Sequence, residues 1–290
     1  MLLLKRICYL FFVTLTIFIV SCNKKNVLPN NTLQEQNILN VAYGNNSLQT
    51  MDIYLPAGRD TIHTKLLLLI HGGAWTSGDK ADFDTAITTL KTSLPNYVIA
   101  NINYRLASIQ GTDLWPTQLN DVQQAYQFIL QQSNKYVFNK KQVAAFGASA
   151  GAQLALLLGY TINNNIKAVI DLFGPTDLAA LYYNAPNPYY PSLLSIFLNG
   201  TPVTNPASYT SASPLFFATN TQIPPTIIFH GTADDVVPIS QSDSLNNRLN
   251  NLNVYHEYIQ YQGAGHGWTG NNLIDTYSKS IQFLQKIMPN

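Results

Sequence analysis

Residues Gly147 to Gly151 have the spacing Gly-x-Ser-x-Gly, which can present a serine hydroxyl for nucleophilic chemistry. The apolar run 142–146 before them predicts a short buried strand, and the run 153–158 after them predicts a buried helix. Between a strand and a helix, small residues beside Ser149 allow a tight turn that lifts the hydroxyl above a sheet. An ordinary turn of small residues has the same pattern, so other parts of the chain must distinguish the two interpretations.

A serine hydroxyl is a poor nucleophile at neutral pH until an imidazole accepts its proton. The chain has five histidines, and only His266 lies between flexible glycines and downstream of a carboxylate. We therefore expect His266 to be the base for Ser149. The others lie in glycine turns, in a predicted strand or in a polar segment, namely His71, His230, His256 and His63. The two histidines in glycine turns are expected to brace their loops.

Asp234 is the expected partner of His266, because a carboxylate would fix the tautomer of the imidazole and stabilise the imidazolium. Asp235 is the alternative. Ser149, Asp234 and His266 each follow a predicted strand, at the edge where ligand sites of open α/β sheets gather. The order nucleophile, acid, histidine is that of α/β-hydrolases and differs from the other serine-hydrolase folds. The sequence thus predicts a Ser-His-Asp triad for acyl transfer.

Two glycines follow another predicted central strand and could bind the anion that acyl transfer forms. The apolar run 65–70 leads through a histidine into Gly72 and Gly73. Glycines in this position let backbone N–H groups approach a ligand closely, as an oxyanion hole requires. We expect the N–H groups of Gly72, Gly73 and Ala150, the residue after the serine, to form that hole. A plain glycine turn is the alternative.

The elements that position these residues predict an α/β fold. Strands alternate with helices from residue 65 onward, which calls for a mostly parallel sheet covered by helices on both faces. Period-two alternation at 40–44 and 48–56 predicts an antiparallel hairpin at one edge. Apolar or alternating runs predict the other strands, at 65–70, 97–103, 142–146, 166–173, 225–231 and 254–261. The clearest helical periodicities lie at 116–130 and 273–287.

Segment 178–222 differs from this pattern, since its aromatic residues lie among prolines and asparagines. We expect it to be a small inserted, mostly irregular cap. Its aromatic rings could line a concave site or simply pack the insertion onto the body. Among candidate substrate contacts we name Tyr182 in this segment, together with Trp75 and Trp268. Outside the cap, we expect Arg105 to form a structural ion pair with Asp121.

Composition limits the possible partners. The chain has 290 residues, enough for one large α/β domain, and a net charge of +1 without a basic cluster, which argues against nucleic acid binding. One of its two cysteines, Cys8, lies in an N-terminal segment that we expect to be removed. The body therefore lacks thiolate ligands for a metal, and no cluster of other ligands suggests a metal or an organic cofactor. The oligomeric state is not indicated.

The N-terminus has the features of a processing segment. Lys5 and Arg6 precede the uncharged run 7–22, which is short for a membrane-spanning helix. Its last four residues, Ile-Val-Ser-Cys, resemble the cleavage box of bacterial lipoproteins. We expect a signal peptide over 1–21, lipidation of Cys22, a polar tether over 22–39 and a catalytic domain over 40–290. The chain would then be anchored in a bacterial cell envelope, on the periplasmic or outer-membrane side; an ordinary secretory signal and a signal anchor are the alternatives.

Several motifs, taken in order, resemble α/β-hydrolase esterases over residues 40 to 288. They are His71-Gly72-Gly73-Ala74-Trp75, Gly78-Asp79-Lys80, Asn103-Tyr104-Arg105-Leu106, Pro116 with Asp121, Gly147 to Gly151, Gly174 to Leu178, Ser213-Pro214 and His230 to Pro238. The resemblance is to the bifunctional feruloyl and acetylxylan esterase type, related to the hormone-sensitive-lipase carboxylesterases. The acid motif of that family places the carboxylate on Asp234. Ala74 stands where the lipase relatives have a third glycine.

The resemblance implies a serine esterase more strongly than it implies a substrate. We expect the substrates to be acetyl or feruloyl esters of plant polysaccharide, or similar short acyl or aryl esters. A peptidase or amidase of the same fold is an alternative. So is a lipid-anchored binding protein without turnover, although such relatives usually lack the nucleophile or the histidine, and both residues are present in this sequence.

Overall fold

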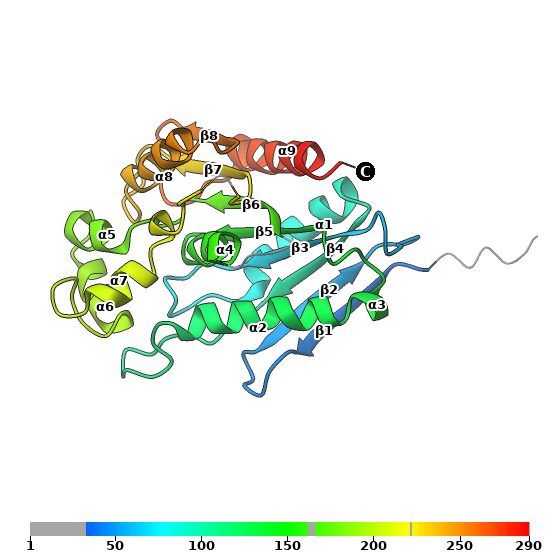
Figure 1. The fold of residues 1–290 in the computed structure, drawn as a ribbon, viewed down its shortest axis with the longest axis horizontal. Helices are drawn as coiled ribbons and strands as arrows, with labels where there is room; N and C mark the ends of the chain where they lie inside the picture. Colours follow the sequence, from blue (N-terminus) through cyan, green and yellow to red (C-terminus); the bar gives the residue numbers. More distant parts are fainter. Residues whose placement is uncertain (1–32, 162–165, 221, 290) are drawn as a thin grey trace, which may run out of the picture. The chain divides into compact units, whose positions relative to one another are not determined.

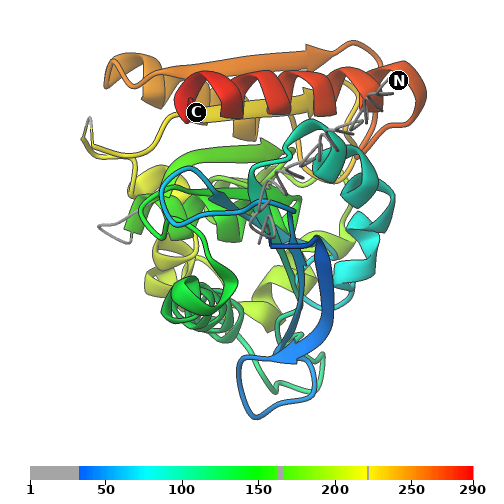
Figure 2. The same cartoon turned by 90° about the vertical axis from the view of Figure 1, so that its right-hand side faces the viewer.

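The computed structural model describes residues 33–161, 166–220 and 222–289. Within them, eight strands form one sheet in the order β1-β2-β4-β3-β5-β6-β7-β8 (Figure 1). Strands β1 and β2 pair antiparallel, as do β2 and β4, and all other neighbours are parallel. The expected mostly parallel sheet with an antiparallel hairpin at one edge is therefore confirmed. The direction of the strands turns steadily from β1 to β8, as the twist of a sheet requires (Figure 2).

The strands lie close to their predicted positions. Their bounds are β1 Gln36–Ala42, β2 Thr50–Leu55, β3 Lys65–Ile70, β4 Tyr97–Ile102, β5 Val143–Ala148, β6 Ile166–Leu172, β7 Thr226–Gly231 and β8 His256–Tyr261. The helices outside the cap are η1 Lys80–Phe83, α1 Asp84–Ser93, α2 Thr117–Gln131, α3 Ser133–Tyr136, α4 Ala150–Thr161, α8 Ser240–Asn251 and α9 Gly270–Ile287.

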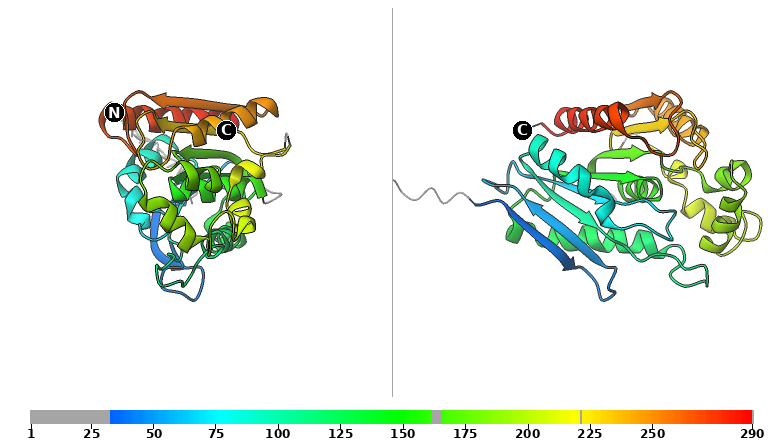
Figure 3. Two further views of the ribbon diagram at one scale, coloured as in Figure 1. Left: turned by 90° about the vertical axis from the view of Figure 1, so that its left-hand side faces the viewer. Right: turned by 180° about the vertical axis from the view of Figure 1, so that it is seen from behind.

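Side chains that alternate along the central strands pack into two separate cores. On β3, the odd positions Leu67 and Leu69 join a core with α1 and α9, while Leu66 and Leu68 join a larger core with α2, α4 and α8. Figure 1 views the face with α2 and α4, and the right panel of Figure 3 views the face with α1 and α9. Because both faces are covered, the central strands are buried at nearly every position and mostly apolar, as the continuous runs predict.

The segment expected to be a mostly irregular cap is helical instead. It contains α5 Leu178–Asn184, α6 Tyr189–Phe197, α7 Pro206–Ser211 and η2 Pro214–Phe216. These helices gather beyond the carboxyl ends of the parallel strands (Figure 1). The expectation of an irregular segment was wrong, because Pro206 and Pro214 lie in the first turns of their helices, where proline is tolerated.

The N-terminal boundary also differs from the expectation. Strand β1 begins at Gln36, so the segment expected to be tether up to residue 39 contributes residues to the sheet. β1 is exposed along most of its length, and its sequence therefore lacks a clear apolar face. The expected signal peptide and Cys22 lie outside the described residues. Among the residues that are described, no helix combines the length and apolarity needed to cross a membrane.

Two buried carboxylates of the fold differ sharply in their environments. Asp121 on α2 accepts four hydrogen bonds, three from Arg105 and one from the side chain of Gln49, at 2.7–2.9 Å. The expected Arg105–Asp121 ion pair is therefore confirmed. Asp171 on β6 is equally buried, but its Oδ1 accepts only the N–H of Gly174, and its Oδ2 has no partner among the described residues. Burial raises the pKa of Asp171 to about 7, against a partial lowering by the Gly174 N–H group and by His230.

We predict that Asp121→Asn lowers the free energy of unfolding by about 3 kcal/mol, because it leaves Arg105 without its buried charged partner and with only the partly exposed Asp113 at 3.1 Å. Arg105→Lys should cost less than Asp121→Asn, since it keeps the charge but loses the two-pronged contact of Nε and Nη2. Urea unfolding at pH 7 measures both. The matched control is Lys91→Gln in the exposed pair with Glu35, which should change stability by no more than about 0.5 kcal/mol. Equal effects at both pairs would contradict the prediction.

Asp171→Asn is predicted to stabilise the protein in a pH-dependent way. The native pKa of Asp171 lies above the ordinary value of about 3.9, so the wild-type protein loses stability as pH rises from about 4 to about 7. The neutral asparagine avoids that loss, which amounts to roughly 4 kcal/mol at most. Denaturant unfolding of both proteins at pH 4 and pH 8 should show a larger advantage for the variant at pH 8. An advantage that does not change with pH would contradict the assigned ionisation.

Candidate active site

Ser149 lies in the turn between β5 and α4, with its backbone in the left-handed region at φ 54°. Its N–H donates to the carbonyl of Leu172 on the neighbouring strand. A side chain at either glycine of the motif would clash with the backbone. A Cβ on Gly147 would lie 2.1 Å from the Gly151 carbonyl oxygen, and a Cβ on Gly151 would lie 2.1 Å from the Ile70 carbonyl oxygen. The spacing Gly-x-Ser-x-Gly is therefore a steric consequence of how tightly this turn packs.

The structure brings Ser149, His266 and Asp234 into one hydrogen-bonded chain. Nε2 of His266 lies 2.9 Å from the Ser149 hydroxyl oxygen, and Nδ1 lies 2.8 Å from Oδ2 of Asp234. A carboxylate can only accept, so Nδ1–H donates to Asp234 and the free Nε2 can accept the proton of Ser149. Asp235, the alternative acid, is exposed and does not contact His266. The ring of Phe173 packs edge-on against His266, with 4.6 Å between the ring centroids.

Asp234 is held as a charged carboxylate. Burial by itself would raise its pKa, but hydrogen bonds from His230 and His266, together with the Val236 N–H group, hold the pKa well below its usual range. The N–H groups of Val236 and Val237 both donate to Oδ1 at 2.9 Å. Asp234 therefore remains ionised wherever His266 is neutral, as a partner that orients the imidazole must be.

His230, at the end of β7, supports the Asp234 loop from inside the fold. Its Nε2 lies 2.8 Å from the Val237 carbonyl oxygen and 3.3 Å from Oδ2 of Asp234. Nε2–H donates to these acceptors, and the hydroxyl of Ser242 donates to Nδ1 at 2.6 Å. The side chain is fully buried. The expectation that His230 braces its loop is confirmed.

The loop after β3 lies directly beside the Ser149 turn. A Cβ on Gly72 would be 2.9 Å from the Ala148 carbonyl oxygen, and Gly73 has φ 106°, a conformation that favours glycine. The hydrogen bonds of the described residues do not use the N–H groups of Gly72, Gly73 or Ala150. These donors therefore remain available to a ligand next to Ser149.

The side chains of Tyr104 and His71 donate hydrogen bonds to the carbonyl groups of the same loop. The ring of Tyr104 stacks on His71, with 4.3 Å between the centroids, and its hydroxyl donates to the His71 carbonyl at 2.9 Å and the Gly72 carbonyl at 3.3 Å. Nδ1–H of His71 donates to the Gly72 carbonyl at 2.7 Å. Burial lowers the pKa of His71, which favours the neutral ring. This histidine thus braces its loop, as expected.

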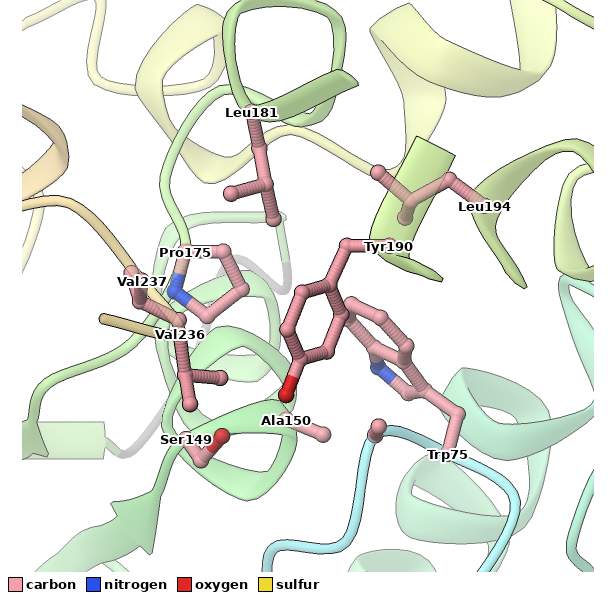
Figure 4. A pocket seen from close by; sticks show the side chains of 10 residues that line it. Trp75, Ser149, Ala150, Pro175, Leu181, Tyr190, Leu194, Val236 and Val237 are labelled. Atoms are coloured by element: carbon pink, nitrogen blue, oxygen red, sulfur yellow. The ribbon is translucent and has the colours of Figure 1, made fainter. Parts of the chain in front are cut away.

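An apolar cavity adjoins Ser149 (Figure 4). Its volume, including the open mouth, is about 310 Å³. It is lined by Ala74, Trp75, Ser149, Ala150, Pro175, Leu181, Tyr190, Leu194, Val236 and Val237. Of these, Trp75, Ser149 and Ala150 were predicted from the sequence as site residues. Tyr190 and Leu194 could have been found from their spacing of four residues, which places them on one face of a helix, had α6 been expected.

The other two candidate substrate contacts lie elsewhere. Trp268 packs against Phe173 behind His266, and its Nε1–H donates to Thr276 on α9. Tyr182 on α5 packs against two other cap tyrosines, Tyr183 and Tyr209. Neither ring lines the cavity beside Ser149. Within the described ranges, no three histidine, cysteine or acidic side chains are grouped so that they could hold a metal ion.

Comparison with known proteins agrees with this geometry. The chain is 26% identical to Esterase LipC of Mycobacterium tuberculosis over 79% of its own length, and it spans 59% of that protein. A truncated carbohydrate esterase from gut microbiota has a similar structure, with a TM-score of 0.74 and 24% identity, covering 88% of this chain and 97% of the other. A bifunctional GH43-CE protein of Bacteroides eggerthii has a TM-score of 0.73 and 26% identity, covering 86% of this chain and 38% of the other.

The sequence matches one protein family over most of the α/β fold. The matched residues are 51–249, more than half of the chain. They include the loop after β3, the Ser149 turn, the cap helices and Asp234. The chain therefore belongs to the BD-FAE family of α/β-hydrolase esterases.

Proposed function

We propose that this protein is a serine hydrolase of carboxylic esters, acting on acetyl or feruloyl esters of plant polysaccharide or on similar short acyl and aryl esters. The observation that carries the proposal is the hydrogen-bonded chain from Ser149 through His266 to Asp234, beside backbone N–H groups that have no acceptor among the described residues. Acyl transfer through an alcohol nucleophile needs both parts.

In the proposed first step, the Ser149 oxygen attacks the ester carbonyl carbon while its proton passes to Nε2 of His266. The carbonyl oxygen becomes an anion and accepts hydrogen bonds from the N–H groups of Gly72, Gly73 and Ala150, each worth about 3 kcal/mol in such sites. The bond between the carbonyl carbon and the alcohol oxygen then breaks. The alcohol oxygen takes the proton from His266, and an acyl group remains on Ser149.

In the second step, water replaces the alcohol. His266 accepts a proton from the water as its oxygen attacks the acyl carbon, and the same N–H groups bind the new oxyanion. When the bond to Ser149 breaks, His266 returns its proton to the serine oxygen and the carboxylic acid leaves. Asp234 stays ionised throughout and stabilises the imidazolium of each step.

The choice of a carbohydrate ester rests on membership of the BD-FAE family and on similarity to the bifunctional GH43-CE protein of Bacteroides eggerthii. The apolar lining of the cavity beside Ser149 supports a neutral acyl group. The cavity is narrow: its volume of about 310 Å³ includes the open mouth, and only about 20 Å³ can hold the centre of a water-sized sphere. That size suits a short acyl chain.

The proposal predicts that the purified protein hydrolyses p-nitrophenyl acetate and at least one of acetylated xylan and methyl ferulate. Ser149→Ala should lower kcat by roughly 10⁴-fold or more, because the nucleophile is removed. Initial rates, with the folded state checked by circular dichroism, measure this. The matched control is Ser244→Ala, which changes an exposed serine on α8 and should leave the rates unchanged.

An aminoacyl anilide in the same assay separates the alternatives. Cleavage of the anilide without ester turnover would indicate a peptidase or amidase. A folded protein that is silent on all four substrates and is not labelled by an organophosphonate would contradict an enzymatic function, and it would favour the binding-protein alternative.

We further propose that residues 1–21 are a lipoprotein signal peptide and that Cys22 carries the lipid anchor in a bacterial envelope. The support is the sequence itself, in which Ile19-Val20-Ser21-Cys22 ends an uncharged run after Lys5 and Arg6. Expression in a bacterial host with radiolabelled palmitate should label the wild-type protein in the membrane fraction. Cys22→Ser should abolish the label, with Cys8→Ser as the matched control. Equal labelling of wild type and Cys22→Ser would contradict the anchor.

A further inference from the structure

The cavity beside Ser149 lies on the acyl side of the reaction proposed above. The leaving alcohol must take its proton from Nε2 of His266, so the alcohol binds next to that ring. His266 is not among the residues that line the cavity, whereas Ala74 and Ala150 are. An acyl group bound to Ser149 therefore extends into this cavity, away from the histidine.

The ring of Tyr190 occupies the space into which a long acyl chain would extend. Figure 4 shows the ring between Ser149 and the two leucines that line the upper part of the cavity, Leu181 and Leu194, with its hydroxyl directed toward Ser149. The hydroxyl has no hydrogen-bond partner in the described part of the chain. The ring is thus placed by the helix that carries it and by packing.

The helix that carries Tyr190 is itself fixed to the loop beside Ser149. Tyr190, Leu194 and Phe197 follow one another at four and three residues, so they share one face of α6. Phe197 stacks on Trp75 with 4.5 Å between the ring centroids, and Nε1–H of Trp75 donates to the side chain of Gln153 on α4 at 3.0 Å. Trp75 is 3% exposed. Helix α6 and the loop after β3 therefore pack together, and this packing fixes the position of the helix that carries Tyr190.

We infer that Tyr190 determines the length of the acyl group, favouring short groups such as acetyl over longer ones such as feruloyl, and that its removal opens the cavity toward Leu181 and Leu194. This inference depends on the proposed esterase function. It concerns the aromatic ring, so phenylalanine at the same position should preserve the restriction while alanine should not. An added methylene in an apolar pocket changes specificity by roughly 10-fold or more where the pocket has no room for it.

The test measures kcat/KM for p-nitrophenyl acetate, butyrate and octanoate. The wild-type protein should prefer acetate and discriminate strongly against octanoate. Tyr190→Ala should raise the ratio of octanoate to acetate by about 10-fold or more. Tyr190→Phe should keep the wild-type ratio. Tyr183→Ala, which removes an exposed tyrosine from the same cap, is the matched control and should also keep it.

If the alanine variant unfolds, Tyr190→Leu provides a second test of the same ratio, because leucine preserves the apolar face of α6 but is smaller than tyrosine. It should give an intermediate rise in the same ratio. A wild-type protein that hydrolyses octanoate as fast as acetate would overturn the inference, and so would a folded Tyr190→Ala or Tyr190→Leu variant with an unchanged ratio. Failure of the underlying function appears differently, as rates that are the same in wild type and Ser149→Ala.

Discussion

At the Ser149 turn, the backbone at the start of helix α4 meets the backbone at the end of strand β3 with no side chain between them, and the site depends on that close approach. A Cβ on Gly151 would lie 2.1 Å from the carbonyl oxygen of Ile70 and 2.3 Å from that of His71. Such distances cannot be relieved by turning a side chain, because both partners are backbone. With glycine present, the start of α4 packs against the end of β3, and the serine lies next to the N–H groups of the following loop. The left-handed backbone of Ser149 is part of the same arrangement.

The buried carboxylates differ in how many hydrogen-bond donors surround them. Asp121 and Asp234 are both buried and both accept several hydrogen bonds, one set serving the fold and the other orienting His266. Asp171 lies on a central strand with a single N–H donor, and its pKa is raised by burial. Asp234 and Asp171 show that burial alone does not determine the pKa of a carboxylate, since the hydrogen-bond donors around Asp234 lower its pKa while Asp171 has only one such donor.

Much of the site was predictable because it follows local rules. Parallel strands end at one edge of the sheet, so the residues after β5, β7 and β8 had to meet there, and Ser149, one of two adjacent aspartates and His266 offered the required chemistry in the required order. The exposed Asp235 illustrates what the sequence left open, since two adjacent carboxylates have the same local signal and only the fold distinguishes them. The start of β1 was missed for a related reason, because an exposed edge strand has little apolar patterning.

The cap was the least predictable part, because short helices with proline in the first turn have weak periodicity and depend on tertiary packing. Tyr190 lies in this cap and was not predicted to line the site, whereas Trp75 was predicted because it adjoins a glycine motif. Tyr182 was named instead, from composition, and its ring packs within the cap. Residues on an inserted segment, such as Tyr190, are thus harder to predict than residues at the ends of central strands, such as Ser149.

The central claim, that Ser149 carries the acyl group between the two steps, is tested most directly by mass spectrometry. The protein would be mixed with p-nitrophenyl acetate, and the reaction would be quenched in acid within milliseconds. After digestion, the mass of the peptide that contains Ser149 would be measured. We predict that this peptide carries one acetyl group in the wild-type protein, in an amount that rises before steady state and disappears when the substrate is consumed. Ester turnover at full rate with no acetyl group on that peptide, or with acetyl on another residue, would contradict the account.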